Sequence, residues 1–280
     1  MPDVGLASAP CNPCIGGVGK GQVVRELDAL GALTPILADK TGIQFRTLNE
    51  SKGFAVQSTR VQIDKELYSQ EAEKEIDKNE FIQVIRQKVS SVKSLNGIFL
   101  VKCHNQQQFE AKKIIMTVGT FLGGKLHTGE DVKSGGRVGC EAAESLTEIF
   151  SEIKKAPNRF KTGTPPRILA SSVDYSKCEE QASDSETLNF HWAHSENQAR
   201  FSKQVSCYLT RTTDKTMNII RENKERSPMY NGQIKAIGAR YCPSIEDKAY
   251  RYPDKQIHHV FIEPEGLNLQ TVYPSGISSS

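Results

Sequence analysis

The sequence predicts an α/β fold, and three stretches lead to that prediction. Residues 22–30 place four apolar side chains at spacings of three and four, which is one face of a helix. Residues 81–103 change to a strand period and contain the hairpin turn signal Asn96-Gly97. Residues 114–118 are an apolar run followed by a glycine loop. That order is typical of a buried strand in an open α/β sheet, where ligands lie beyond the carboxyl end of the strand.

In the first half of the chain the sequence predicts two helices followed by strands. The helix at residues 22–30 follows the glycine-rich segment CIGGVGKG, and Gly31 would end it. A turn at NESKG comes next, and then a second amphipathic helix whose apolar residues are Val61, Ile63, Leu67 and Tyr68. The charged run EAEKEIDKNE is its solvated end or a linker. The segments FIQVIRQKV, SSVKS and IFLVKC then predict a β-meander.

The second half is richer in loops. SGGRVG, residues 134–139, would open a helix that runs through Leu146, Ile149 and Phe150. TGTPPR, residues 162–167, cannot be regular structure because adjacent prolines remove donors and restrict the backbone, so we interpret it as a crossing between domains. Three further expectations are a loop at residues 174–197, a helix at residues 213–223, and a loop-rich end from Gly238 with the strand HHVFIEP.

Composition and charge exclude some classes of protein. With 37% hydrophobic and 25% charged residues, the 280-residue chain is typical of a globular protein. No apolar run approaches the roughly 18 residues of a membrane span, and the N-terminus resembles no signal peptide. We therefore expect a cytoplasmic protein with no membrane segment. Its seven cysteines should be reduced, because an odd number cannot pair completely. Residues 200–255 hold twelve Lys and Arg against six Asp and Glu, which is a solvated face or a surface for nucleic acid.

The stretch CNPCIGGVGKG, residues 11–21, admits several chemistries. Glycine-rich turns before a helix attract phosphate, but this loop lacks both the Ser or Thr of a P-loop and the GxGxxG spacing, and no predicted strand precedes it. A plain structural turn is an equal alternative. Cys11 and Cys14 have the spacing of a redox pair or of half a zinc site. Because no second pair has a standard spacing, bystander thiols or one reactive cysteine are favoured over zinc.

The stretch GARYCPSIEDK, residues 238–248, contains another candidate. Cys242 lies between the cationic residues Arg240 and Lys248, and positive charge lowers the pKa of a thiol toward the nucleophilic thiolate. A buried structural cysteine is the alternative. Because Pro243 favours an exposed, stiff loop, we interpret Cys242 as reactive.

Several long motifs occur in one order along nearly the whole chain. They are CNPCIGGVGKG with VVRELDALG, GIQFRTLNESKG, the run Thr59, Arg60, Gln62 and Asp64, TVGTFLGGKLHTG, SGGRVG, KTGTPPRI, RSPMY, GARYCPSIEDK and IEPEGLNLQTVYPSGIS. Together they make the chain similar to the MnmG family, also called GidA, of tRNA uridine 5-carboxymethylaminomethyl modification enzymes.

The resemblance implies an incomplete Rossmann-type FAD-binding domain with an inserted smaller α+β domain. The FAD-binding domain would cover residues 1–165, with the β-meander near 81–110, and would resume at 242–280 after an inserted domain at 166–241. The family's GxGxxG turn and its C-terminal helical domain have no counterpart in this sequence, which resembles an internal fragment. Since that turn is the main anion site for FAD, we expect weak or no flavin binding by this chain alone.

The resemblance also implies an activity. It is FAD- and NADH-dependent addition of a carboxymethylaminomethyl or aminomethyl group to carbon five of the wobble uridine of tRNA, with methylenetetrahydrofolate as one-carbon donor. The implied partners are tRNA, the GTPase MnmE and, in the full-length protein, a second copy in a homodimer. The alternatives are a folate- and FAD-dependent tRNA uracil-5-methyltransferase and a non-catalytic fragment that binds tRNA or a partner protein.

The family's functional residues can be matched to this sequence one by one. Cys11 and Cys242 match its two important cysteines, of which one thiolate would add to carbon six of uracil while the other transfers protons. Cys14 takes the place of a small non-thiol residue, so the CxxC spacing is incidental. The implied FAD residues are Gly16, Gly17, Gly19, Val89, Gly119, Thr120 and Ala143. The implied nicotinamide residues are Gly238, Ala239, Arg240, Tyr241, Cys242, Pro243, Ser244, Ile245, Glu246, Asp247, Lys248, Ala249, Tyr250, Arg251 and Tyr252. No metal ligand is implied.

Overall fold

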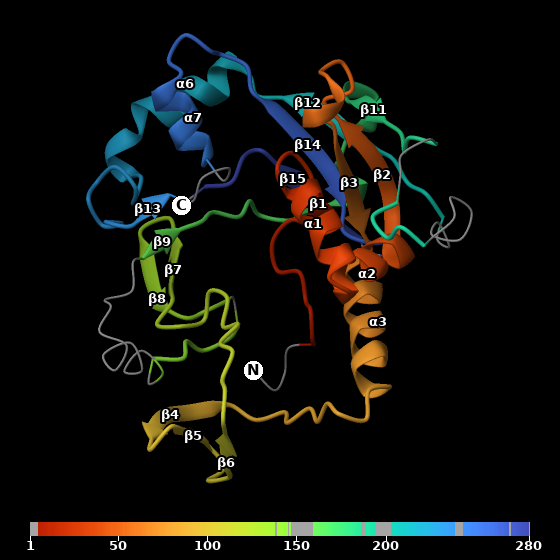
Figure 1. The fold of residues 1–280 in the computed structure, drawn as a ribbon. Coiled ribbons are helices and arrows are strands. Elements are labelled where there is room, and N and C mark those ends of the chain that lie inside the picture. The colour runs from red at the N-terminus through yellow and green to blue at the C-terminus, as the bar shows by residue number, and fades with distance from the viewer. Residues whose placement is uncertain are drawn as a thin grey trace.

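A computed structural model describes the chain over residues 5–137, 139–144, 146, 159–185, 189–193, 203–238, 243–268 and 270–279. Within these ranges the protein has a mixed α/β fold, with separate small sheets joined by helices and extended segments (Figure 1). In the same ranges no helix has both the length and the apolar character that a membrane span requires.

The first part of the chain forms a three-stranded antiparallel sheet with three helices beside it (Figure 1). The strands, in sheet order, are β1 (Cys14–Gly16), β3 (Ser58–Ile63) and β2 (Gly42–Leu48). The helices are α1 (Lys20–Ala29), α2 (Leu33–Thr41) and α3 (Lys65–Asp77). Their shared core includes Val24, Leu37, Phe45, Val61, Ile63, Tyr68 and Phe190. Burial of these apolar side chains stabilises this part of the fold.

A five-stranded antiparallel sheet carries the last part of the chain. Its strands, in sheet order, are β10 (Ile168–Leu169), β15 (Thr271–Ser275), β14 (His259–Pro264), β12 (Cys207–Arg211) and β11 (Glu179–Gln181). Strands from the ranges 166–241 and 242–280 therefore share one sheet. Asp184 and Val205 donate backbone hydrogen bonds to the carbonyls of Phe45 and Ile43 in β2, both at 2.8 Å, which joins the two larger sheets.

The remaining elements are small. They are the meander β4 (Val89–Leu95), β5 (Ile98–Cys103) and β6 (Gln108–Ala111), the hairpin β7 (Lys125–Thr128) and β8 (Asp131–Ser134), the parallel pair β9 (Phe160–Lys161) and β13 (Ile237–Gly238), and the helices α6 (Asp214–Glu222) and α7 (Ile245–Arg251). Short 3-10 helices occupy Phe54–Val56, Ala170–Ser172, Tyr175–Lys177 and Lys224–Arg226. Figure 1 shows the meander well apart from the β1–β3–β2 sheet, at the end of extended segments.

Several sequence predictions are confirmed. Helix α1 forms where predicted, and Gly31 follows it with a positive φ of 78°. Asn96 and Gly97 form the turn between β4 and β5, again with positive φ. Helix α6 and strand β14 also lie where the sequence predicted them. These elements were predictable because their determinants, apolar period and turn residues, are local.

The buried face of α1 differs from the apolar stripe of its sequence. The helix buries Gly21, Val24 and Asp28, whereas Leu30 is 83% exposed and Val23 is 51% exposed. The Asp28 carboxylate explains the orientation, because it accepts a hydrogen bond from the backbone of the segment at residues 189–193 and contacts the His191 ring there. A tertiary contact, not the helical period, therefore sets which face is buried.

Four other predictions were wrong. Val61 and Ile63 lie in β3, the central strand of its sheet, and the helix starts only after Asp64. Residues 81–88 and 114–118 are not strands, because within the described ranges no neighbouring strand pairs with them; Phe81 and Ile115 are each 89% exposed. Residues 139–144 are not helical, and Ile149 and Phe150 lie outside the described residues.

Several elements had not been predicted, among them α2, β2, β12 and β15. Strand β1 directly precedes the glycine loop, where no strand was predicted, because three residues are too few to show a period. Strand β11 lies inside the predicted loop at residues 174–197. Helix α7 lies in the predicted loop-rich end and starts with a capping box between Ser244 and Asp247.

Candidate functional site

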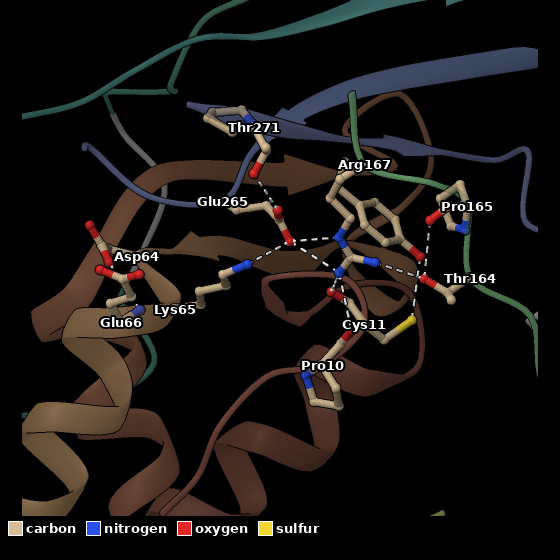
Figure 2. Close-up of polar contacts among 12 residues, drawn as sticks. Pro10, Cys11, Asp64, Lys65, Glu66, Thr164, Pro165, Arg167, Glu265 and Thr271 are labelled. Atoms are coloured by element: carbon tan, nitrogen blue, oxygen red, sulfur yellow. Dashed lines mark hydrogen bonds and ion pairs between the residues drawn. The ribbon is translucent and has the colours of Figure 1, made fainter. Parts of the chain in front are cut away.

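Cys11 lies in the loop before β1 and faces strand β15. Its Sγ is 3.3 Å from the hydroxyl of Tyr273, which is 3% exposed (Figure 2). The next residue, Asn12, donates from its side chain to Ser275 Oγ at 3.4 Å. Two contacts with alternate residues of one strand therefore place the Cys11 loop against β15.

Arg167, from the TGTPPR segment, fixes the backbone of this loop. Its Nη2 donates to the carbonyls of Pro10 at 3.0 Å and Cys11 at 3.1 Å (Figure 2). Its Nη1 donates to Thr164 Oγ1 at 3.0 Å, and its guanidinium carbon lies 4.8 Å from the ring centroid of Tyr273. Because Arg167 has five donors in a rigid fork, it can hold loop and strand at once.

Glu265 compensates the charge of Arg167. This carboxylate is fully buried, and its Oε1 contacts Arg167 Nε and Nη2 at 3.1 Å and Lys65 Nζ at 3.0 Å. Its Oε2 accepts from Thr271 Oγ1 at 3.1 Å. Since both oxygens have partners, the buried charge is satisfied. We refer to Cys11, Thr164, Arg167, Glu265 and Tyr273 as the Cys11 cluster.

The start of α3 holds Glu265 in place. Asp64 caps the helix by accepting from the backbone of Glu66 and Leu67, and its other oxygen accepts from Leu267 N at 2.9 Å. A Cβ on Gly266 would lie 2.9 Å from that oxygen, so the EPEG turn needs glycine there. One carboxylate therefore joins the helix start to the turn that carries Glu265.

Tyr273 is held in its protonated form. Burial raises the pKa of Tyr273, and the hydrogen bond to Cys11 raises it further. The phenol therefore keeps its proton at neutral pH and can donate a hydrogen bond.

Cys14 belongs to a different environment. Near it the buried pair Arg60–Glu263 joins β3 to β14, with Nη2 and Oε1 2.5 Å apart. Burial opposes the charge of Arg60, but Glu263, Cys14 and Cys207 together outweigh it and the pKa of Arg60 is raised. Burial raises the pKa of the Cys14 thiol and, with Glu263, raises the pKa of Cys207 to about 12. Cys14 is therefore a neutral thiol beside an ion pair, outside the Cys11 cluster.

The glycine loop packs closely against β3. A Cβ on Gly16 would lie 2.4 Å from Thr59 O, and one on Gly21 would lie 2.3 Å from Ser58 Oγ. The backbone N–H of Gly17 donates to Thr59 O at 2.9 Å, and those of residues 20 and 21 donate to Gly17 O. Close packing explains these glycines, and three N–H groups that a phosphate would need are already used.

The other residues predicted for FAD lie near one another. Thr120 Oγ1 donates to Gly136 O at 2.6 Å, and Ala143 N donates to Phe121 O at 2.8 Å, so residues 119–121 and 143 meet. The residue before Val89, Lys88, pairs with Glu141 at 2.5 Å. A hollow of about 360 Å³ opens there, lined by Lys88, His104, Ser134, Glu141, Ala142 and Glu144. The structure thus groups four of the predicted FAD residues, Val89, Gly119, Thr120 and Ala143. The other three, Gly16, Gly17 and Gly19, belong to the first sheet and its turn.

Seven of the fifteen residues predicted for nicotinamide form helix α7. Ile245 and Ala249 pack on Met217 of α6, and Glu246 and Asp247 are also buried. Burial and the charge of Lys255 lower the pKa of Lys248, which donates to Gly276 O at 2.6 Å. The more exposed members of the set include Gly238, Pro243, Arg251 and Tyr252. The other predicted residues Ala239, Arg240, Tyr241 and Cys242 lie outside the described residues.

Four members of the Cys11 cluster were not predicted as site residues. They are Thr164, Arg167, Glu265 and Tyr273, which all lie within motifs of the sequence, KTGTPPRI and IEPEGLNLQTVYPSGIS. The signal that could have identified the site was a pair of oppositely charged residues in loops, the carboxylate Glu265 and the arginine Arg167. Over the described part of the chain, no group of three or more His, Cys, Asp or Glu side chains could hold a metal ion.

The family model for Glucose inhibited division protein A, GidA, matches residues 4–280. The chain belongs to the GidA family. Among solved structures, Aquifex aeolicus GidA in the form I crystal matches with a TM-score of 0.88 and 40% identity, over 98% of this chain and 46% of that one. The same GidA in the form II crystal matches with a TM-score of 0.86 and 38% identity, over 98% and 44%. The chain therefore spans less than half the length of these GidA structures, and the family resemblance of its motifs is confirmed.

Proposed function

We propose that the chain is part of a FAD- and NADH-dependent enzyme that modifies carbon five of the wobble uridine of tRNA in the cytoplasm. The observation that supports this proposal is the GidA match over residues 4–280. The proposal includes methylenetetrahydrofolate as one-carbon donor, the GTPase MnmE as partner and a homodimer of the full-length protein. It also includes an incomplete Rossmann-type domain at 1–165 and 242–280 with an insertion at 166–241.

In this proposal Cys11 is the nucleophile. Its thiolate adds to carbon six of the uracil ring, and the electron pair of the broken carbon–carbon π bond makes carbon five nucleophilic. After carbon five has formed its new bond, it loses its proton to a base, and the Cys11 thiolate leaves carbon six. Cys242 is proposed for the proton transfer. Both thiols are partly exposed, but the surroundings of Cys11 favour this role: Arg167 holds its backbone, whereas Cys14 is a neutral thiol beside a buried ion pair.

The hollow beside β4 is the better of the two candidate places for FAD. Its lining residues Lys88 and Ala142 are the chain neighbours of Val89 and Ala143, and a Cβ on Gly119 would have no atom within 4 Å. The turn at Gly16 is packed against β3 and offers fewer free donors. When bound, FAD would supply hydride-transfer chemistry. We propose the exposed members of the 238–252 segment for the nicotinamide dinucleotide.

Nucleoside analysis of tRNA tests the activity. A strain without the full-length gene is complemented with the wild type, Cys11→Ser or Cys14→Ala, and its tRNA nucleosides are measured by mass spectrometry. We expect the wild type and Cys14→Ala to restore the modified wobble uridine, and Cys11→Ser to restore none, because serine lacks the nucleophilic thiolate.

The other outcomes separate the alternatives. Dependence of ribothymidine on this gene would support a uracil-5-methyltransferase. Normal wobble uridines in the deletion strain, with salt-sensitive tRNA binding by the chain, would support a non-catalytic binding module. Restoration by Cys11→Ser would contradict the assignment of Cys11.

A further inference from the structure

We propose that Tyr273 activates Cys11 by donating a hydrogen bond to its thiolate. The Sγ–Oη distance of 3.3 Å lies within the range of hydrogen bonds to sulfur, and the two residues are 262 positions apart in the chain (Figure 2). The role of this contact in catalysis rests on the proposed function, but its effect on the thiol can be measured without tRNA or cofactor.

The direction of the hydrogen bond follows from the charge of the thiolate. Thr164 and Ser278 are further side-chain hydrogen-bond partners of Tyr273. Thr164 Oγ1 is also 3.5 Å from Pro165 O, which is long for an O–H donor. A thiolate has no proton, so in its contact with Tyr273 it can only accept. Once Cys11 is ionised, the phenol is the partner of this pair that has a proton to donate.

The phenol is available as a donor across the working pH range. Its pKa is raised by burial, so the phenol keeps its proton through the neutral range. A donor that binds the charged form of an acid favours that form. The thiolate, not the thiol, is the nucleophile, so Tyr273 increases the reactive fraction of Cys11 near neutral pH.

The charged groups around the pair nearly compensate one another. Arg167 lies over the Tyr273 ring and donates to Cys11 O, and Glu265 is paired with both Arg167 and Lys65. On the neighbouring strand β14, Glu263 lies opposite Tyr273 and is paired with Arg60. Asn12 and Ser275 are neutral. Each of these carboxylates is already paired with a cationic side chain. Removal of the neutral Tyr273 hydroxyl is therefore the change that acts directly on the Cys11 thiolate.

Alkylation of Cys11 tests the proposal. Full-length wild type and Tyr273→Phe are treated with iodoacetamide between pH 6 and 10, and the Cys11 peptide is quantified by mass spectrometry. We expect the midpoint of the Cys11 rate profile to rise by about one pKa unit in Tyr273→Phe, so that alkylation near pH 7 slows about ten-fold. The plateau at high pH should be equal or faster, because a thiolate of higher pKa is intrinsically more nucleophilic.

Two further variants keep the result interpretable. Tyr208→Phe removes a phenol from strand β12 of the same sheet, where Tyr208 contacts Tyr175, and should leave the Cys11 profile unchanged. Thr164→Val keeps Tyr273 but removes the hydroxyl that orients it, and should shift the profile in the same direction by less. This variant decides the question if Tyr273→Phe does not fold. An unchanged or lower midpoint in the folded variants would overturn the proposal.

The two proposals fail in different ways. A shifted alkylation profile in a protein that leaves wobble uridines unmodified would overturn the proposed function and support the Tyr273 contact. Wobble modification that depends on Cys11, with alkylation and modification unchanged by Tyr273→Phe, would overturn the Tyr273 role alone.

Discussion

Cys11 and Cys14 are three positions apart and have different surroundings. Cys11 contacts a phenol on β15, and its backbone is bound by Arg167. Cys14 lies in β1, where burial raises its pKa and Arg60 is nearby. Successive residues of an extended chain point to opposite sides, so close sequence spacing does not ensure a shared site. The two cysteines of the CxxC stretch therefore belong to two separate clusters and do not form one site.

Glu265 provides the test at the scale of residues. Glu265→Gln removes the charge shared by Lys65 and Arg167, each of which keeps some access to water. We expect a loss of about 2 kcal/mol in the free energy of unfolding, the range for hydrogen bonds to charged groups. Urea denaturation measures it. The control Glu66→Gln, an exposed side chain on α3 next to Lys65, should change stability by less than about 0.5 kcal/mol. Equal effects of the two substitutions would contradict the importance of the buried carboxylate.

Among the elements, the turn between β1 and α1 depends on close packing. Its glycines allow β3 to approach the backbone, with Phe190 on the other side of Gly16. The N–H groups of the turn bind protein carbonyls, so the turn forms part of the core of the first sheet. A glycine-rich sequence before a helix therefore has a structural explanation here.

Gly16→Ala tests this explanation. Its φ of +83° disfavours a side chain, and the added Cβ would lie 2.5 Å from the Phe190 ring. We expect a loss of about 2 kcal/mol or more, from backbone strain together with displacement of packed atoms. The control Gly53→Ala has a φ of −56° and open space around its Cβ, and should be neutral or slightly stabilising. Thermal unfolding compares the two; similar melting temperatures would rule out the packing role.

Across the whole molecule, the residues proposed for cofactors are spread over separate parts of the fold. The hollow beside β4 and the turn at Gly16 belong to different sheets, which Figure 1 shows apart. The chain spans 46% of the Aquifex GidA structure of the form I crystal. A dinucleotide such as FAD is bound along an extended surface, with its pyrophosphate on free backbone N–H groups.

We therefore expect the 280-residue chain alone to retain little FAD. After incubation with FAD and removal of the excess by gel filtration, its visible spectrum should lack a flavin band, because the N–H groups of residues 17, 20 and 21 are already bonded. A full-length GidA protein treated in the same way is the positive control. A retained stoichiometric band would show that the hollow beside β4 is sufficient for binding, and Lys88→Ala would then be the next variant to measure.

The sequence by itself determined the local elements and the family. Helix α1, the Asn96-Gly97 turn, helix α6 and strand β14 follow from apolar period and turn residues over a few positions. The order of long motifs identified the family without any knowledge of contacts. It also identified Cys11, because that residue lies within a motif.

Only the tertiary structure decided what surrounds Cys11 and which faces are buried. Tyr273 and Arg167 are 262 and 156 positions from Cys11, and the pairing of β14 with β15 and the path of the TGTPPR segment bring them there. The exposed runs at residues 81–88 and 114–118 have strand-like sequences but no partner strand in the described ranges. A strand forms only when another backbone supplies its hydrogen bonds, and a site of this kind forms only when distant loops meet. Both depend on contacts that no local pattern of residues encodes.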